Sequence, residues 1–147
     1  MEHITDTTEA LKAAFRRHAS GVCLITMNDP EGNPVGFTAT SVTSLGSDPA
    51  LASFNVARGA SSWPALAVAE YISIQMLNES SLPLAIRMSQ DHTQRFTPKD
   101  WFREPKTNLP MFEKINAALI CKVVARQEVE KNAGVVVEIL EGLLAEE

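Results

Sequence analysis

Hydrophobic residues occur along this chain mostly in short runs, each bounded by residues that favour turns. Runs of this length, rich in β-branched and aromatic residues, are typical of β-strands. Six strands are expected, at residues 22–27, 35–39, 51–56, 71–77, 118–125 and 135–140. Residues 29–33 predict a hairpin turn between the first two. Six strands in one small chain indicate a barrel, because closure removes the unpaired edges of an open sheet.

Helical signals occur at three other places. Residues 8–18 carry apolar positions at helical spacing after Asp6, which lies three residues before a glutamate, the spacing of a capping box. A second helix is expected to begin at Trp63, with Ser62 as its N-cap and a proline in its first turn. A short third helix is expected at residues 81–88.

Residues 91–111 differ from the rest of the chain. This stretch is polar, contains several prolines and has aromatic residues without a clear period. We expect a long, partly ordered loop. Loops of this length within a compact domain are often lids or binding segments, and surface packing is an equally good interpretation.

Composition and charge narrow the class of protein. A chain of 147 residues fits one domain, here residues 1–147, and its 45% hydrophobic and 21% charged residues are ordinary for a globular fold. The net charge of −5 argues against binding nucleic acid through phosphates, which needs a concentrated basic surface. The one dense basic cluster, Lys12, Arg16 and Arg17, is interpreted as a solvated helix face.

Neither a membrane segment nor a metal site is expected. The chain has no run of about 20 apolar residues and no leader-like N-terminus, so we expect a cytoplasmic protein. Cys23 and Cys121 lie far apart in apolar surroundings, without the spacing of metal ligands. They are expected to be buried, reduced thiols.

The first candidate binding segment is residues 36–44, where five hydroxyl residues fall within nine positions after a predicted strand. Such a segment can direct hydroxyl and backbone N–H groups at a polar ligand. An isoalloxazine ring needs partners of this kind, because its pyrimidine edge combines carbonyl acceptors with an N–H donor. An ordinary strand and turn rich in threonine and serine would have the same composition.

The second candidate segment is residues 55–64, where a strand end leads into a helix start rich in hydroxyl groups. Ser61 and Ser62, with Arg58 nearby, would cradle a phosphate if the N–H groups of the first helical turn pointed at it. A simple serine N-cap is the alternative.

In this order, residues 14–22, 35–42 and 61–64 are similar to motifs of the FMN-binding split-barrel flavin reductases. The resemblance extends from about Leu11 to Gly142. It implies a mainly β fold: a six-stranded Greek-key split β-barrel with short flanking helices. It also implies a homodimer with the flavin near the subunit interface.

Position in the family motifs assigns flavin contacts residue by residue. The implied contacts are Thr38, Ala39, Thr40, Ser41, Asn55, Ala57, Ser61, Ser62, Arg95 and Phe96. Thr38, Ala39, Thr40 and Ser41 match the positions that contact the isoalloxazine ring and ribityl chain. Asn55 and Ala57 continue the same wall of the binding site. The two serines match the phosphate end, and the last pair matches a loop segment near the cofactor.

The implied activity is an NAD(P)H-dependent flavin reductase. NADH or NADPH would transfer a hydride to N5 of FMN, with FAD as the alternative flavin, and the reduced flavin would supply a monooxygenase. Two positions depart from the family pattern. Asn132 stands where many members have a histidine associated with nicotinamide binding, and Gln75 stands where an asparagine is frequent. Asn132 would still hydrogen-bond a carboxamide, or it marks an FMN-binding carrier or assembly subunit without reductase turnover.

Overall fold

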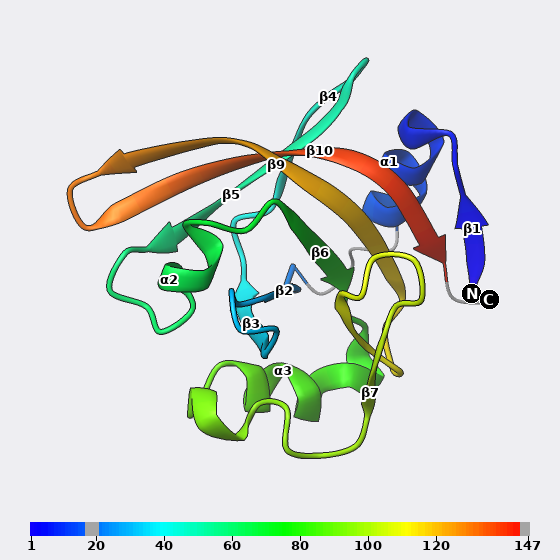
Figure 1. The fold of residues 1–147 in the computed structure, drawn as a ribbon. Helices are drawn as coiled ribbons and strands as arrows, with labels where there is room; N and C mark the ends of the chain where they lie inside the picture. Colours follow the sequence, from blue (N-terminus) through cyan, green and yellow to red (C-terminus); the bar gives the residue numbers. More distant parts are fainter. Residues whose placement is uncertain (17–20, 145–147) are drawn as a thin grey trace.

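The computed structural model describes residues 1–16 and 21–144, which form a mainly β fold with short helices (Figure 1). The strands are β1 (Glu2–Ile4), β2 (Cys23–Asn28), β3 (Pro34–Ala39), β4 (Thr43–Ser47), β5 (Ala50–Ala57), β6 (Tyr71–Met76), β7 (Trp101–Arg103), β8 (Pro110–Phe112), β9 (Ala117–Val129) and β10 (Asn132–Leu144). The helices are α1 (Thr7–Arg16), α2 (Trp63–Leu66) and α3 (Leu82–Met88), with 3-10 turns η1 (Glu79–Ser81) and η2 (His92–Gln94).

The main sheet is antiparallel and has the order β3-β2-β6-β9-β10-β5-β4, with β1 paired to β10. All six predicted strands lie in it, which confirms the mainly β class. The strand number is corrected: the described sheet has eight strands, because β1 and β4 were not predicted. β4 contains only one large apolar residue, Leu45, and its pairing depends on β5, which follows it across a tight turn.

The sheet curls around one hydrophobic core. The ring centroids of Phe37 on β3 and Phe54 on β5 lie 6.2 Å apart, although these strands are far from each other in the order of the sheet. Along β10 the buried positions alternate, as expected for a strand with one face on the core. The fully buried side chains include Ile25, Ile72, Ile74, Leu119, Val135 and Val137.

The hairpin of β9 and β10 is the longest feature of the fold and reaches away from the core (Figure 1). Two register irregularities bend it. The β5–α2 segment is tied to this hairpin by Arg58, which donates to the carbonyl of Glu130 at 2.6 Å, and by Arg126, which donates to the carbonyl of Leu66 at 2.9 Å. The position of the segment that follows β5 is therefore fixed by the hairpin.

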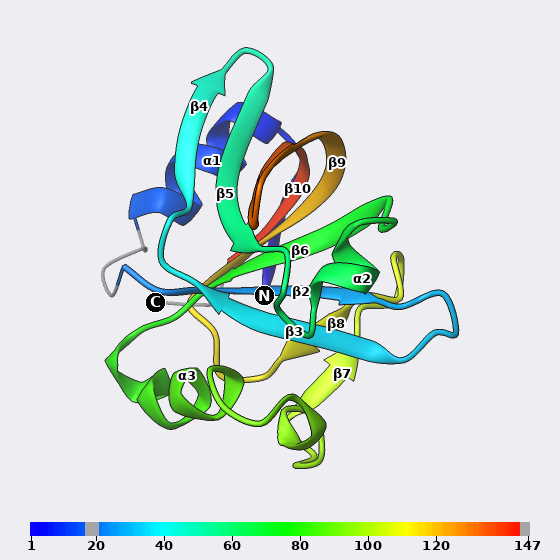
Figure 2. The ribbon, with the colours of Figure 1, turned by 90° about the vertical axis from the view of Figure 1, so that its left-hand side faces the viewer.

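Residues 91–111 are more ordered than the predicted loop. They contain η2 and the small sheet of β7 and β8, which packs with α3 beneath β2 and β3 (Figure 2). Gln75, fully buried on β6, connects the two layers: its amide nitrogen donates to the carbonyl of Pro110 at 3.1 Å and its oxygen accepts from the N–H of Phe112 at 2.9 Å. The long amide at this position is thus used as a structural bridge.

Other local predictions have mixed outcomes. The N–H of Glu9 donates to the Asp6 carboxylate at 3.1 Å, as the capping-box spacing predicts, and α1 begins at Thr7. Residues 17–20, including Arg17 and His18, lie outside the described residues. Asp29 accepts from the N–H groups of two residues in the predicted turn, which confirms the hairpin.

Both cysteines are buried thiols outside any disulfide among the described residues, as predicted. Burial raises the pKa of the Cys23 thiol to about 12 and also raises the pKa of Cys121. Within residues 1–16 and 21–144, no group of three His, Cys, Asp or Glu side chains is placed to hold a metal ion. No helix in this part of the chain is long and apolar enough to cross a membrane.

Candidate functional site

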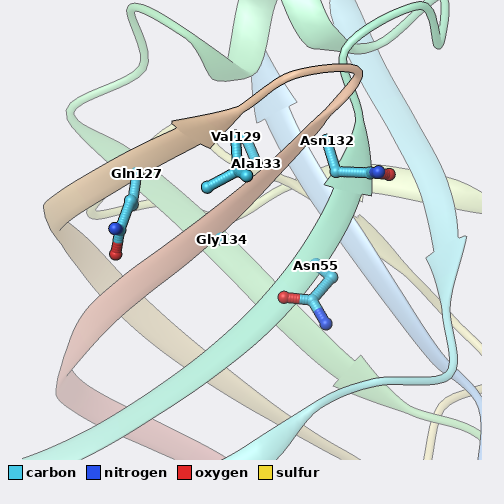
Figure 3. Close-up of a pocket in the computed structure, with 6 residues that line it drawn as sticks. All are labelled: Asn55, Gln127, Val129, Asn132, Ala133 and Gly134. Atoms are coloured by element: carbon cyan, nitrogen blue, oxygen red, sulfur yellow. The ribbon is translucent and has the colours of Figure 1, made fainter.

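Two cavities among the described residues are lined by predicted site residues, and these are the candidate cavities. The larger, of about 420 Å³, lies on the outer face of β5, β10 and β9 (Figure 3). It is lined by Asn55, Gln127, Val129, Asn132, Ala133 and Gly134. Three of these residues carry amide side chains. An amide offers both a donor and an acceptor, as do the carboxamide of nicotinamide and the pyrimidine edge of isoalloxazine.

Strand register brings these amides together. Gly134 on β10 pairs with Asn55 on β5 and with Gln127 on β9, and Asn132, two residues earlier, pairs with Ala57. Residues two apart on a strand share a face, so the exposed Asn55 and Ala57 accompany Asn132 on the outer side. Gly134 adds no side chain between its two amide neighbours. Three of the predicted residues, Asn55, Ala57 and Asn132, are therefore neighbours here, although more than seventy positions separate Asn132 from the other two.

The smaller cavity, of about 80 Å³, lies between the start of β3, the β5–α2 segment and the η2 loop. It is lined by Pro34, Val35, Gly36, Ser61, Ser62, His92, Arg95 and Phe96. The structure thus brings together both predicted serines and both predicted loop residues. A space of this size suits a phosphate group and is too small for a three-ring isoalloxazine.

Arg95 provides the positive charge of the smaller cavity. Its Nη1 donates to the carbonyl of Gly36 at 2.7 Å, and its Nε and Nη2 donate to the carbonyl of Gln90 at 3.1 and 2.8 Å. These partners are neutral. The pKa of Arg95 is lowered, because the effect of burial exceeds the opposing effect of the nearby Asp91. A guanidinium nevertheless stays protonated at neutral pH. Arg95 therefore retains a positive charge that an anion would balance.

The serine pair behaves differently from the sequence prediction. Ser62 occupies the N-cap position of α2, but its side chain makes no capping hydrogen bond, so the predicted side-chain cap is wrong. The backbone of Ser62 is already helical, which turns the hydroxyl away from the usual cap geometry. Because α2 has only four residues, its dipole contributes little, and an anion at this place would depend on Arg95 and the two serines.

Arg58 does not face the two serines. Its Nε lies 3.2 Å from a carboxylate oxygen of Glu128, and its Nη1 donates to the carbonyl of Glu130 at 2.6 Å. The hairpin of β9 and β10 therefore holds the guanidinium that proximity in sequence placed near a phosphate. The cation of the smaller cavity is supplied instead by Arg95, from a segment more than thirty residues further along.

The hydroxyl-rich segment forms the end of β3 and its connection to β4. Ala39 is buried, whereas Thr40 is exposed and Thr38 and Ser41 are partly exposed. The Ser41 hydroxyl accepts from the backbone N–H of Asn55 at 2.8 Å, which joins this segment to the wall of the larger cavity. Side chains can contact a ligand at three of these positions, and at Ala39 only the backbone is available.

Sequence reasoning missed His92 and Gln127. His92 enters the smaller cavity from η2, where no hydrophobic period marks the backbone, and Gln127 enters the larger one through pairing across the hairpin. The alternation of apolar and polar residues along β9 and β10 was the available signal for Gln127. No comparable signal existed for His92.

The curled antiparallel sheet with its short helices defines a mainly β protein of the split-barrel class. The chain belongs to the flavin reductase-like domain family, whose model matches residues 15–147.

Among curated relatives, the reductase subunit of stachydrine N-demethylase from Rhizobium meliloti is 36% identical over 114 residues, covering 78% of this chain and 49% of the relative. An NADH:FMN oxidoreductase from Rhodococcus qingshengii is 41% identical over 100 residues, covering 68% and 52% respectively. This chain thus spans about half the length of these relatives. A solved flavin reductase domain protein from Arthrobacter sp. FB24 has 42% sequence identity and a TM-score of 0.82, with 95% of this chain and 86% of the other covered.

Proposed function

We propose that this chain is an NAD(P)H-dependent flavin reductase that binds FMN and places the terminal phosphate in the smaller cavity. The observation that carries this proposal is the convergence of Ser61, Ser62 and Arg95 on a phosphate-sized space. Charge-assisted hydrogen bonds from a guanidinium are about twice as strong as neutral ones, and the neutral partners of Arg95 leave its charge available. The family of the chain supports the same assignment.

The remaining predicted residues would bind the rest of the ligand. Thr38, Thr40 and Ser41 offer hydroxyl groups to the ribityl chain and ring edge, and Asn55 joins them through its backbone contact with Ser41. Asn132 offers an amide to the carboxamide of NADH or NADPH. Bound flavin supplies the hydride-accepting chemistry at N5, while the protein binds and orients the two rings. FAD is the alternative flavin.

A homodimer is part of the proposal, with the larger cavity completed by a second copy. The hairpin beside this cavity exposes Val124, Val129 and Leu140, with 49%, 58% and 38% of their surface accessible. These side chains are spread along the hairpin, and contact with a second copy would bury them. A flavin bound at this face would lie near both subunits.

A monooxygenase is the proposed recipient of reduced flavin. The relative from Rhizobium meliloti is named as the reductase subunit of an N-demethylase, and the relative from Rhodococcus qingshengii as an NADH:FMN oxidoreductase. These names support a two-component system and NADH as the donor to test first. NADPH is the second donor.

Asn132 favours a second candidate function, an FMN-binding carrier or assembly subunit. It lines the larger cavity at the position where many family members have histidine, and an amide cannot carry the positive charge of an imidazolium. Nicotinamide binding would be weakened most by this change, and flavin binding least.

One experiment separates the two functions. FMN-loaded protein is mixed anaerobically with NADH and, separately, with NADPH, and the loss of oxidised-flavin absorbance is followed. Rapid bleaching by either nucleotide is the expected result, and it would rule out the carrier function. Bound FMN that stays oxidised with both donors would overturn the reductase.

A further inference from the structure

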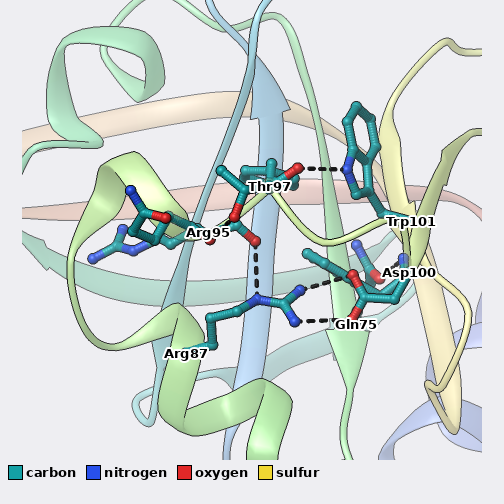
Figure 4. A network of polar contacts seen from close by, with 9 residues as sticks. Gln75, Arg87, Arg95, Thr97, Asp100 and Trp101 are labelled. Carbon is teal, nitrogen blue, oxygen red and sulfur yellow. Dashed lines mark hydrogen bonds and ion pairs between the residues drawn. The ribbon is translucent and has the colours of Figure 1, made fainter.

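Arg87 lies on α3, outside both cavities, yet it contacts the backbone of the smaller cavity (Figure 4). Its Nε donates to the carbonyl oxygen of Arg95 at 3.2 Å. Its two terminal nitrogens donate to both carboxylate oxygens of Asp100, at 3.0 and 2.8 Å. One side chain thus joins the helix to both ends of a six-residue loop segment.

The peptide groups of the two cavity residues from this loop are held from outside the cavity. The Nε of Arg87 donates to the carbonyl of Arg95, and the indole N–H of Trp101 donates to the carbonyl of Phe96 at 2.9 Å. The Phe96 ring stacks on Phe112, with centroids 5.4 Å apart, and the Arg87 guanidinium lies 5.7 Å from the Phe112 centroid. These contacts fix the backbone from which the Arg95 side chain reaches the carbonyl of Gly36.

The role of Arg87 is geometric because its charge is already balanced. The bidentate pair with Asp100 is partly shielded, with 23% and 36% of the two side chains accessible. A neutralised guanidinium adds little attraction for a phosphate, whereas Arg95 has only neutral hydrogen-bond partners. Arg87 therefore supports the backbone of the loop, and Arg95 supplies the positive charge.

We propose that Arg87 is a positioning residue for anion binding: it holds the Arg95–Phe96 peptide so that the Arg95 guanidinium lies at the phosphate site. This inference rests on the proposed function. It predicts that loss of Arg87 weakens the binding of a ligand with a terminal phosphate and leaves the binding of the same ligand without its phosphate nearly unchanged.

Arg103 provides the matched control. It lies on β7 in the same layer, donates to the carbonyls of Gly32 and Asn108 at 2.9 and 3.2 Å, and lies 5.2 Å from the Trp101 ring centroid. Arg103 therefore ties this layer to the β2–β3 turn with comparable contacts. Among the interactions of the described residues, Arg103 forms no hydrogen bond with the Arg95–Phe96 peptide, which Arg87 contacts directly. Its ring contact is with Trp101, whose indole N–H keeps its own hydrogen bond to the carbonyl of Phe96.

The experiment measures dissociation constants for FMN and riboflavin, together with melting temperature, in the wild type, Arg87→Met and Arg103→Met. The constant for FMN should rise about tenfold in R87M, an effect of about 1.4 kcal/mol, while that for riboflavin changes less than about twofold. R103M should lower the melting temperature without altering the ratio of the two constants. Arg87→Lys should fall between wild type and R87M, because one ammonium cannot reproduce the fork that serves Asp100 and the carbonyl together.

Equal losses for FMN and riboflavin in R87M, or an equal loss of FMN in R103M, would overturn the positioning role. If R87M does not fold, Arg87→Lys and Asp100→Asn provide the same comparison in milder form. Ser61→Ala/Ser62→Ala is measured in parallel. If this double variant loses FMN selectively and the Arg87 variants do not, the positioning role fails while the phosphate site stands. A wild type that binds FMN no better than riboflavin overturns both.

Discussion

The two candidate cavities are built in different ways. The larger one uses side chains on three paired strands, where the backbone ladder of β5, β10 and β9 fixes Asn55, Gln127 and Asn132. The smaller one joins segments that share no ladder, and Arg95 and Phe96 are held there by hydrogen bonds from side chains to carbonyls and by ring stacking. A ladder spreads the support over many bonds, whereas the smaller cavity depends on a few side chains.

The largest effect should follow from cutting the bridge between the barrel and the β7–β8 layer. Gln75→Leu leaves the buried N–H of Phe112 without its partner and removes one of the two donors to the carbonyl of Pro110, which keeps the Thr26 hydroxyl. The two losses together cost about 3 kcal/mol in the free energy of unfolding. Denaturant unfolding measures this loss. Gln127→Leu, on the exposed part of β9, is the control and should change stability little. Equal stability of Q75L and wild type would contradict the bridge.

Arg95→Met should have the next largest effect, on ligand affinity. Removal of the guanidinium takes away the charge-assisted hydrogen bonds to a phosphate, so the dissociation constant for FMN should rise about a hundredfold and that for riboflavin only slightly. Titration of flavin fluorescence measures both constants. Arg58→Met removes an arginine that holds the β5–α2 segment to the hairpin without facing the cavity, so it should weaken FMN and riboflavin binding slightly and to the same extent. If R58M lost FMN more strongly than R95M, the cation of the site would have been assigned to the wrong residue.

A smaller loss is expected for Ser61→Ala/Ser62→Ala. The double variant removes two neutral hydrogen-bond donors and keeps the charge of Arg95. The dissociation constant for FMN should therefore rise about tenfold, and that for riboflavin much less. The same titration applies, with Ser44→Ala on β4 as a control that carries an exposed hydroxyl away from the cavity. Similar losses for both ligands would show that the serines support the fold and do not contact a phosphate.

The smallest effect is expected in the cavity built on strands. Asn132→His should lower the KM for NADH by only a few fold, because it restores the side chain associated with nicotinamide binding. FMN affinity should stay intact, because the strand ladder keeps the backbone at this position in place. Steady-state oxidation of NADH with saturating FMN measures the KM, and Lys122→Ala, at an exposed position of β9 outside the cavity lining, is the control. A large loss of FMN in N132H would mean that the two cavities are not independent.

Much of the fold was predictable because alternation and turn residues are local signals. The six apolar runs, the turn at Asp29 and the start of α1 after Asp6 all depend on residues close together in the chain. The short strand β4 escaped prediction because its partner β5 decides its pairing and its own residues do not. For the same reason the β7–β8 sheet resembled a loop: Gln75, far away in sequence, orders it.

The candidate site was predictable only in part. Motif resemblance indicated Ser61, Ser62, Arg95 and Phe96 as residues near one ligand, and these residues do line one cavity. Local reasoning made Arg58 the cation, because it considered distance along the chain, whereas Glu128 holds that side chain on the hairpin. No local pattern indicated the support that Arg87 provides from α3.

By itself, the sequence determined which segments are strands, which thiols are buried and which residues resemble a flavin-binding set. Only the tertiary structure decided that Arg95 supplies the charge, that His92 joins it, and that Ser62 is not a side-chain cap. The physical reason is that strand formation and burial follow from the hydrophobic pattern of neighbouring residues. The partner of a charged or polar side chain, in contrast, depends on which distant backbone the fold brings within hydrogen-bond distance.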